Sequence, residues 1–218
     1  MGTSDEEATD RRAALVDRLV AAGTVRTGAV EDAMRSVPRH RFVPEVDLGT
    51  AYADRAQLVK DGDDGALSTI SQPTMVAVML ELAELRAGSR VLEIGTGTGY
   101  NAALLGQLVG REGSVVSVDL EADLVDRARR LLSSLGLDRV SIHRADGSFG
   151  WPAAAPFDCV IATAGVDEVP DAWRAQTAVG GRLLVPMLDD QLLRVEVRVA
   201  DDRWETIATP PAAFIPLR

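Results

Sequence analysis

Several residue types that metal and disulfide chemistry needs are scarce in this chain of 218 residues. Cys159 is its only cysteine, which excludes a disulfide framework and a zinc site built from thiolates. His40 and His143 are the only histidines, so a histidine-rich metal centre is disfavoured and we predict no bound metal. Aromatic residues make up only 4% of the chain, and the core is therefore predicted to consist mostly of Ala, Val and Leu.

Long apolar runs and positive charge are also in short supply. No apolar segment approaches membrane-spanning length and the N-terminus lacks a signal-peptide core, so we expect a soluble, cytoplasmic protein without membrane contact. Acidic residues outnumber Lys and Arg by 33 to 23, giving a net charge of −10. This disfavours a nucleic-acid partner, because phosphate backbones are bound by clustered cations. The length suits one domain, and we expect a monomer.

From residue 72 onward, predicted strands and helices alternate. Helical periodicity covers residues 73–85, 100–109 and 122–135, and "PDAWRAQTA" forms a further short helix. The strands between them are "SRVLEIG", "SVVSVDL", "RVSIHRAD", "FDCVIATAG" and "GGRLLVPML". This alternation predicts an α/β fold with a doubly wound, mostly parallel sheet. The last thirty residues are expected to add an antiparallel hairpin that turns at 200–202.

The first seventy residues follow a different pattern. Helices are expected at 6–22 and 28–36, followed by the two-proline segment "VPRHRFVPE" and an irregular charged loop at 54–66. Because this region has no predicted strand of its own, we interpret residues 1–71 as an N-terminal helical cap with a substrate-side loop. Residues 72–218 are interpreted as a Rossmann-like domain, and the two parts as one compact unit.

A glycine-rich loop marks the predicted ligand site. "VLEIGTGTGYNAALL" places Gly95, Gly97 and Gly99 at the carboxyl end of the first of these strands, where open α/β sheets bind ligands. One glycine suffices for a turn, whereas three in five residues indicate a ligand close to the backbone. The dinucleotide fingerprint requires its third glycine where Tyr100 stands. Glu93, just before the loop, would repel a pyrophosphate but attract a cation such as the sulfonium and amino groups of S-adenosylmethionine.

Carboxylates follow the ends of the next two strands. Asp119 lies about twenty residues beyond the loop, the spacing of a carboxylate that accepts from ribose hydroxyls, with Glu121 as a nearby substitute. Asp146, before Gly147, is placed to accept from an adenine amine. Each has a plain alternative, as an acid at a helix N-terminus or in an Asp-Gly turn. Carboxylates at three successive strand ends together predict a nucleoside site for a cationic cofactor.

Segments throughout the chain resemble the protein-L-isoaspartate O-methyltransferase family. The matching segments are "AMRSVPRHRFVPE", "AYADRA", "TISQPTMVAVMLELAEL", "RVLEIGTGTGYNAALL", "RADGSFGWPAAAPFD", "VIATAGVDEVPDAW" and "GGRLLVPM". "VPRHRFVP" and "TISQP" are far more particular than the glycine loop. The resemblance implies a seven-stranded methyltransferase sheet and S-adenosyl-L-methionine as cofactor, with S-adenosyl-L-homocysteine as product. The implied acceptor is a carboxylate of an aspartyl or isoaspartyl residue in a peptide or protein, whose methyl ester collapses to a succinimide.

The resemblance also assigns residues. Ser71 in "TISQP" matches the family's active-site hydroxyl, and Thr69 is a second candidate catalytic donor; helix capping ahead of Pro73 is an alternative role for both. The predicted cofactor-binding residues are Ser68, Thr69, Ile70, Ser71, Glu93, Gly95, Thr96, Gly97, Gly99, Asn101, Asp119, Leu120, Asp146, Gly147 and Thr163. The predicted substrate-binding residues are Asp54, Gln57, Leu58 and Val59.

One segment departs from the family pattern. Relatives usually carry P-I-G-x-G-Q ahead of T-I-S, whereas this chain has "RAQLVKDGDDGALS" beside the substrate cleft. The departure makes the chain similar to divergent members that tailor a ribosomally made, cyclised peptide at an aspartate to form an aspartimide. Two other classes stay open, a cofactor-binding scaffold without catalysis and a nicotinamide-dependent dehydrogenase. The broken glycine spacing and the missing Tyr-x-x-x-Lys pair speak against the dehydrogenase.

Overall fold

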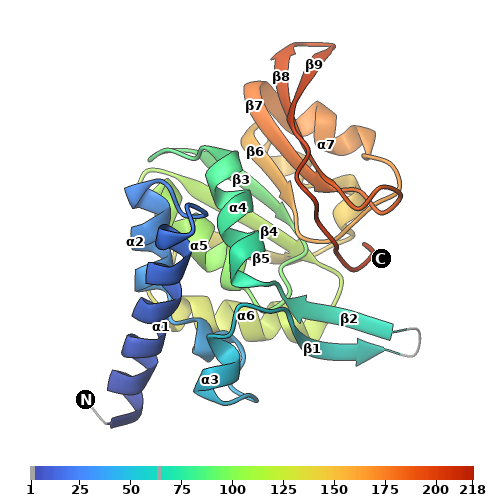
Figure 1. Ribbon diagram of the computed structural model, residues 1–218. Helices are drawn as coiled ribbons and strands as arrows, with labels where there is room; N and C mark the ends of the chain where they lie inside the picture. The colour runs from blue at the N-terminus through green and yellow to red at the C-terminus, as the bar shows by residue number, and fades with distance from the viewer. Residues whose placement is uncertain (1–2, 63–64) are drawn as a thin grey trace.

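A single seven-stranded sheet forms the centre of the molecule (Figure 1). The computed structural model describes residues 3–62 and 65–218. The strands of this sheet, in the order in which they lie side by side, are β5 (Val140–Arg144), β4 (Ser114–Asp119), β3 (Arg90–Ile94), β6 (Phe157–Ala162), β7 (Thr177–Pro186), β8 (Leu193–Ala200) and β9 (Arg203–Ala208). From β5 to β7 neighbouring strands are parallel, and β8 and β9 pair antiparallel. The predicted fold class is confirmed, and the final turn lies between Ala200 and Arg203 as expected.

Helices cover both faces of the sheet because successive side chains of each strand point to opposite sides. Val91 and Val115 belong to one apolar cluster, whereas their neighbours Leu92 and Val116 belong to the other, around Trp173. The first cluster packs under α1 (Thr3–Ala21), α2 (Gly28–Ser36), α4 (Pro73–Ala83), α5 (Tyr100–Val109) and α6 (Ala122–Ser134). The second packs under α7 (Asp171–Gln176) and the short 3₁₀ turns η2 (Gly147–Phe149) and η3 (Pro152–Ala154). The core is mostly Ala, Val and Leu, as the composition predicts.

The helices of the N-terminal cap pack into the main apolar core. α1 and α2 are followed by the 3₁₀ turn η1 (Arg39–Phe42) and by α3 (Leu48–Ala51). Leu15 and Phe42 of the cap share one apolar cluster with Leu104 of α5, which supports the interpretation of cap and sheet as one compact unit. Over the described residues, no helix is both long and apolar enough to cross a membrane.

The predicted irregular loop at 54–66 is wrong in part, because strands occupy most of it. β1 (Gln57–Gly62) and β2 (Gly65–Ile70) form a two-stranded antiparallel hairpin that projects from the body of the molecule in Figure 1. Residues 63 and 64 lie outside the described residues. The charged residues of β1 conceal its strand character in the sequence, because a strand with no fully buried residue needs no strict apolar alternation. The cap therefore does contain strands, although both lie outside the central sheet.

Candidate active site

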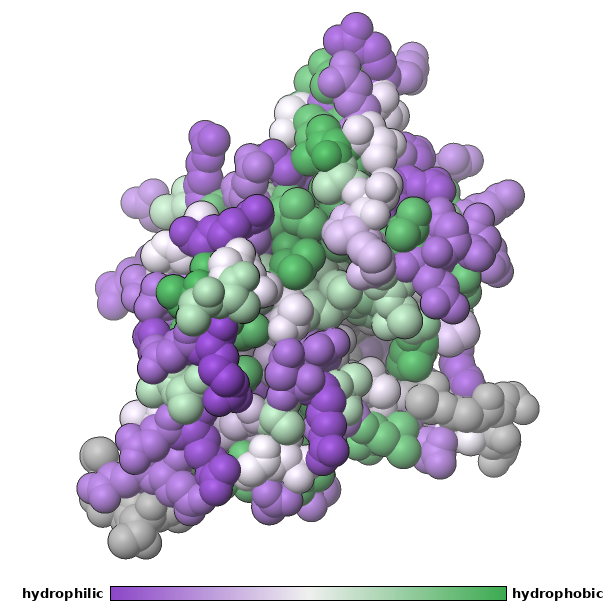
Figure 2. All heavy atoms as spheres, viewed as in Figure 1, coloured by the Kyte–Doolittle hydropathy of each residue, from purple (hydrophilic) through white to green (hydrophobic). Residues whose placement is uncertain are grey.

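A cavity opens at the carboxyl ends of β3 and β4, with about 960 Å³ of space that is partly open to solvent. Its walls are the end of β2, the glycine loop after β3, the loop after β4 and the C-terminal residues 214–218. In Figure 2 the middle of this face is hollowed and mostly pale to green, whereas its rim is purple. The predicted cofactor residues that line the cavity are Ser68, Thr69, Ile70, Ser71, Gly95, Thr96, Gly97, Asn101, Asp119, Leu120, Gly147 and Thr163. Distant sequence segments thus meet at one place.

The glycine loop has a backbone that other residues would not adopt readily. Gly95 has a φ of +94° and Gly97 a φ of +51°. A Cβ on Gly95 would lie 2.5 Å from Thr163 Oγ1, and one on Gly97 would lie 3.2 Å from Ser68 Oγ. These two glycines therefore keep open the space between the loop and its neighbours. Gly99 differs, since it packs against α6 and does not line the cavity.

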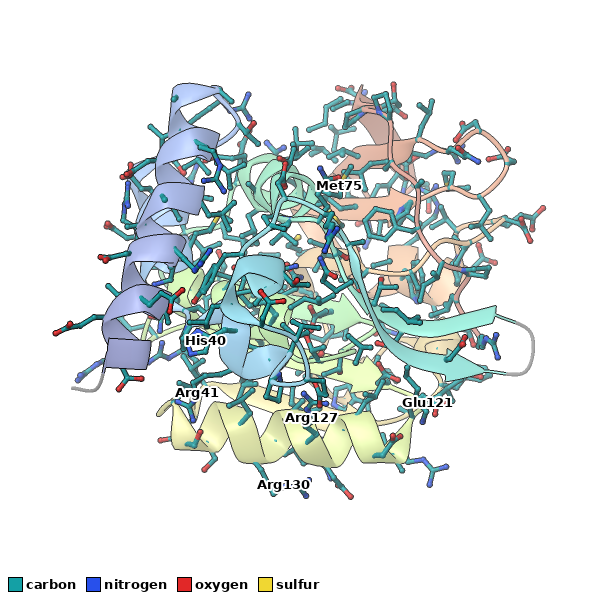
Figure 3. All side chains as sticks on the ribbon, turned by 60° about the horizontal axis from the view of Figure 1, so that its bottom comes forward. His40, Arg41, Met75, Glu121, Arg127 and Arg130 are labelled. Carbon is teal, nitrogen blue, oxygen red and sulfur yellow. The ribbon has the colours of Figure 1, made fainter. Side chains whose placement is uncertain are left out.

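Asp119 joins the glycine loop to the start of α6. Its Oδ2 accepts from the Gly97 N–H at 2.8 Å, and its Oδ1 accepts from the Glu121 N–H at 3.0 Å. Burial is the main influence on this carboxyl and raises its pKa. Glu121, the N-cap residue of α6, also lines the cavity. Lys60 of the hairpin forms one ion pair with Glu121 and a second with Asp123. Figure 3 shows Glu121 at the end of α6 beneath the hairpin.

Glu93 lies beneath the glycine loop and not in the cavity wall, so the expected direct contact with a cation does not match its position. Its Oε1 accepts from Asn101 Nδ2 at 2.8 Å and its Oε2 accepts from the Ser117 hydroxyl, which is also 2.6 Å from Thr96 Oγ1. The side chain points away from the cavity because alternation along β3 turns it toward α5. Full burial raises the pKa of Glu93 to about 7, although both hydrogen bonds act to lower it.

Asp146 does not line the main cavity and lies instead in the wall of a second pocket. Its Oδ1 accepts from the N–H and the hydroxyl of Ser148 at 2.9 and 2.7 Å, which is the capped turn that its sequence context offers as an alternative. Gly147 does line the main cavity, and a Cβ there would lie 2.5 Å from Ile94 Cγ2. The close approach is fixed by Trp173, whose indole N–H donates to the Gly147 carbonyl at 2.8 Å.

The two predicted catalytic hydroxyls lie on the β2 wall. Ser68 and Ile70 are buried, whereas Thr69 and Ser71 are only half-buried. Within the described residues, neither the Thr69 nor the Ser71 hydroxyl forms a hydrogen bond, so both are free to donate to a ligand. Neither hydroxyl caps the N-terminus of α4. The first turn of α4 is instead held by Asp54, which accepts from the Thr74 N–H at 2.8 Å and from the Thr74 hydroxyl at 2.7 Å.

None of the predicted substrate-binding residues lines the cavity. Asp54 is engaged with α4, Gln57 Nε2 donates to the Thr50 carbonyl at 3.4 Å, and Val59 packs against the apolar core. Leu58 is 57% exposed, on the hairpin. Sequence reasoning missed the lining residues of the C-terminal segment, Phe214, Ile215, Pro216, Leu217 and Arg218. Their sequence, "FIPLR", contains no motif with obvious chemistry.

Comparison with known proteins assigns the family. The family model described as protein-L-isoaspartate(D-aspartate) O-methyltransferase matches residues 10–218. The chain belongs to this family. The protein-L-isoaspartate O-methyltransferase of Ignicoccus hospitalis is 40% identical over 210 residues, covering 95% of this chain and 97% of the relative. That of Anaeromyxobacter dehalogenans is 44% identical over 197 residues, covering 88% and 90%.

Solved structures of similar shape agree. A protein-L-isoaspartate O-methyltransferase with 32% identity has a TM-score of 0.78 and covers 94% of this chain and 67% of its own. A putative one from Plasmodium falciparum, solved with S-adenosyl-L-homocysteine, has a TM-score of 0.81 at 21% identity and covers 95% and 98%; it shows the shared fold. The predicted family, the class of carboxyl methyltransferase and the cofactor S-adenosylmethionine are confirmed, whereas the individual site assignments stay predictions.

Proposed function

We propose that this protein transfers a methyl group from S-adenosylmethionine to the side-chain carboxylate of an isoaspartyl residue in a peptide or protein. The observation that carries the proposal is the shared cavity. The glycine loop and the Ser71 end of β2 line the same space, so a cofactor and an acceptor can meet there. Family membership over residues 10–218 supports this choice of substrate and reaction.

The residues around the cavity fit the cofactor. A Cβ at Gly95 or Gly97 would meet Thr163 or Ser68 at the cavity wall, and a Cβ at Gly147, after the end of β5, would meet Ile94. Asp119 keeps carboxylate lone pairs for ribose hydroxyls beyond its two backbone bonds. Asn101, held by Glu93, presents an amide at the cavity wall. When bound there, S-adenosylmethionine supplies an electrophilic methyl group on a sulfonium.

The protein has little proton chemistry to perform. A carboxyl group with a pKa of about 4 is already ionised at neutral pH, so the acceptor oxygen needs no general base. The work of the site is to align this oxygen with the methyl carbon, and good alignment is worth on the order of 7–11 kcal/mol. We assign Ser71 to this task, with its hydroxyl donating to the carboxylate oxygen that is not methylated. Thr69 lines the same wall and is the second candidate donor.

The product accounts for a repair function. As the new oxygen–methyl bond forms, the sulfur–methyl bond breaks, and the opposite charges of carboxylate and sulfonium cancel. The methyl ester is neutral and far more electrophilic than the carboxylate, so the next backbone nitrogen attacks it, loses its proton and closes a succinimide with release of methanol. Hydrolysis of that ring returns aspartate or isoaspartate. Repeated cycles thereby convert isoaspartyl residues back to aspartyl residues.

A labelled-methyl assay tests the proposal. The protein is mixed with methyl-labelled S-adenosylmethionine and a peptide that contains one isoaspartyl residue, and the matched aspartyl peptide is the control. We expect a base-labile ester on the isoaspartyl peptide alone. In Ser71→Ala, kcat is expected to fall roughly 100- to 1,000-fold, as when other enzymes lose one donor to a reacting oxygen. Failure to label the isoaspartyl peptide would contradict the proposed substrate.

Tailoring of a dedicated peptide is a second candidate, favoured by one observation. Residues 57–62 and 65–68, within the segment that departs from the family pattern, form most of the hairpin beside the cavity. A cyclised aspartyl peptide encoded by a neighbouring gene is the appropriate acceptor for this test. Label on that peptide, with none on the isoaspartyl peptide, would select tailoring over repair.

We also propose that the enzyme acts as a monomer on peptides and not on nucleic acids. The net charge of −10 supports the second statement. Size-exclusion chromatography with light scattering gives the mass in solution directly, and a dimer mass would overturn the first statement. Retention on immobilised DNA or RNA at physiological salt would overturn the second.

A further inference from the structure

Arg39 is a buried cation that contacts two segments of the active-site cavity wall, Ser71 after β2 and Tyr100 after the glycine loop. It begins η1 and is 1% exposed. Its guanidinium carbon lies 4.9 Å from the centre of the Tyr100 ring, and Tyr100 is the first residue of α5, directly after the glycine loop. The side chain therefore touches the segment that carries the glycine loop, although Arg39 itself does not line the cavity.

Arg39 is held by backbone carbonyls. Nε donates to the Ala51 carbonyl at 2.9 Å, and Nη2 donates to the Ser71 carbonyl at 2.8 Å. Among the described residues, no carboxylate forms an ion pair with Arg39, and its Nη1 is buried without a hydrogen-bond partner. The cation is thus offset by carbonyl dipoles and by the face of an aromatic ring.

A buried guanidinium without a paired carboxylate is energetically unfavourable compared with an apolar side chain of similar volume. Removing a guanidinium from water without a paired anion is costly, and even buried ion pairs can often be replaced by apolar side chains of similar volume with no loss of stability. What an apolar side chain cannot do is donate to two carbonyls at once from a rigid planar group. The useful property of Arg39 is therefore geometric. Its fork fixes the peptide plane that follows Ser71, relative to α3 and to the start of α5.

We propose that Arg39 is a positioning residue for methyl transfer, which holds the Ser71 peptide, and through it the Ser71 hydroxyl, at a fixed distance from the glycine loop. The inference rests on the proposed role of Ser71. Ser71 lies between the last residue of β2 and Gln72, the N-cap of α4, so its backbone belongs to neither element. The hydrogen bond from Arg39 to the Ser71 carbonyl restricts the backbone of Ser71 and therefore the positions that its hydroxyl can occupy in the cavity. Misplacement by about 1 Å can cost on the order of 100-fold in rate.

Arg39→Lys is the first test, because lysine keeps the charge but loses the planar fork. We expect kcat on an isoaspartyl peptide to fall at least tenfold, while the KM for the peptide and the Kd for S-adenosyl-L-homocysteine stay within threefold. Arg41→Lys is the matched control on the same 3₁₀ turn. Arg41 is exposed, and its guanidinium donates to Ser134 on α6 at 3.0 Å (Figure 3), so kcat is expected to change less than twofold. An unchanged kcat in Arg39→Lys would overturn the proposal.

A double-mutant cycle separates positioning from general destabilisation. If Arg39 acts through the Ser71 hydroxyl, then Arg39→Lys in a Ser71→Ala background should lower kcat by less than threefold, since there is no hydroxyl left to place. An equal loss in both backgrounds would overturn the proposal. If Ser71→Ala alone keeps the wild-type kcat, the proposed action through Ser71 also fails, while methylation of isoaspartate stands. If Arg39→Lys does not unfold cooperatively, Arg39→Gln, which keeps an amide donor without a buried charge, replaces it in the same cycle.

Discussion

The carboxyl group of Glu93 should make the stability of this enzyme depend on pH near neutrality. Glu93 is fully buried, and its pKa is raised from 4.5 to about 7 mainly by burial, with Asp119 adding a smaller repulsion. Because the folded-state pKa is raised, the contribution of Glu93 to stability is fully present below pH 4.5 and is lost as pH rises through 7. A rise of the Glu93 pKa from 4.5 to about 7 corresponds to a total loss of about 3 kcal/mol.

Glu93→Gln isolates this contribution. The glutamine carbonyl can accept from Asn101 Nδ2 as Glu93 Oε1 does, and its amide can donate to the Ser117 hydroxyl, which then donates to Thr96. Urea unfolding of the wild type and the variant is compared at pH 4.5 and pH 8. We expect the difference in unfolding free energy to move in favour of the variant by about 3 kcal/mol between these pH values. Other titrating groups are common to both proteins and cancel.

Ser117→Ala checks the cause of the shift. The Ser117 hydroxyl bond favours the ionised form of Glu93, so its removal should raise the pKa of Glu93 further and move the loss of stability to higher pH. If the difference between wild type and Glu93→Gln is the same at pH 4.5 and pH 8, burial does not raise this pKa and the reasoning is wrong.

Three further predictions concern the cavity. Gly95→Ala should weaken S-adenosyl-L-homocysteine binding at least tenfold in calorimetry, because the new Cβ would meet Thr163. Gly88→Ala is the control and should leave this binding unchanged, because Gly88 has a φ of +90° but no neighbour within 4 Å of a Cβ. Asp119→Asn should also weaken this binding at least tenfold, and unchanged affinity would refute the ribose assignment. Lys60→Met removes the ion pairs to α6, so amides of 57–62 should exchange faster in deuterium exchange, while equal rates would show that the pairs do not hold the hairpin.

The cofactor side of the site could be predicted from sequence because its signals are local. Three glycines in five residues and a carboxylate at the next strand end are short-range patterns, and the parallel sheet brings them together by its topology alone. Glu93 shows the limit of such reasoning. A motif gives the place of a residue in the chain, but the alternation within β3 decides on which side of the loop its carboxylate lies.

The acceptor side resisted prediction because it depends on tertiary contacts. Arg39 and Ser71 are 32 residues apart, and no pattern in the sequence relates the guanidinium to a backbone carbonyl. Asp54 was predicted to bind the substrate, but its carboxylate accepts a hydrogen bond from the Thr74 N–H in the first turn of α4. Strand β1 of the hairpin was missed because Lys60 and Asp61 lie within it and none of its residues is fully buried, which leaves little apolar periodicity to detect.

The two faces of this hairpin show how substrate choice can change without loss of the cofactor site. Ser68 and Ile70 of β2 are buried, and Ser68 Oγ approaches Gly97 of the glycine loop, so this face is constrained by the cofactor cavity. Directly opposed residues in an antiparallel pair share a face, which places Leu58 beside Thr69 on the other side. Leu58 is 57% exposed and contributes little to folding. Substitutions along β1 can therefore alter what an acceptor peptide meets next to Thr69, while the inner face of β2 and the glycine loop keep their geometry.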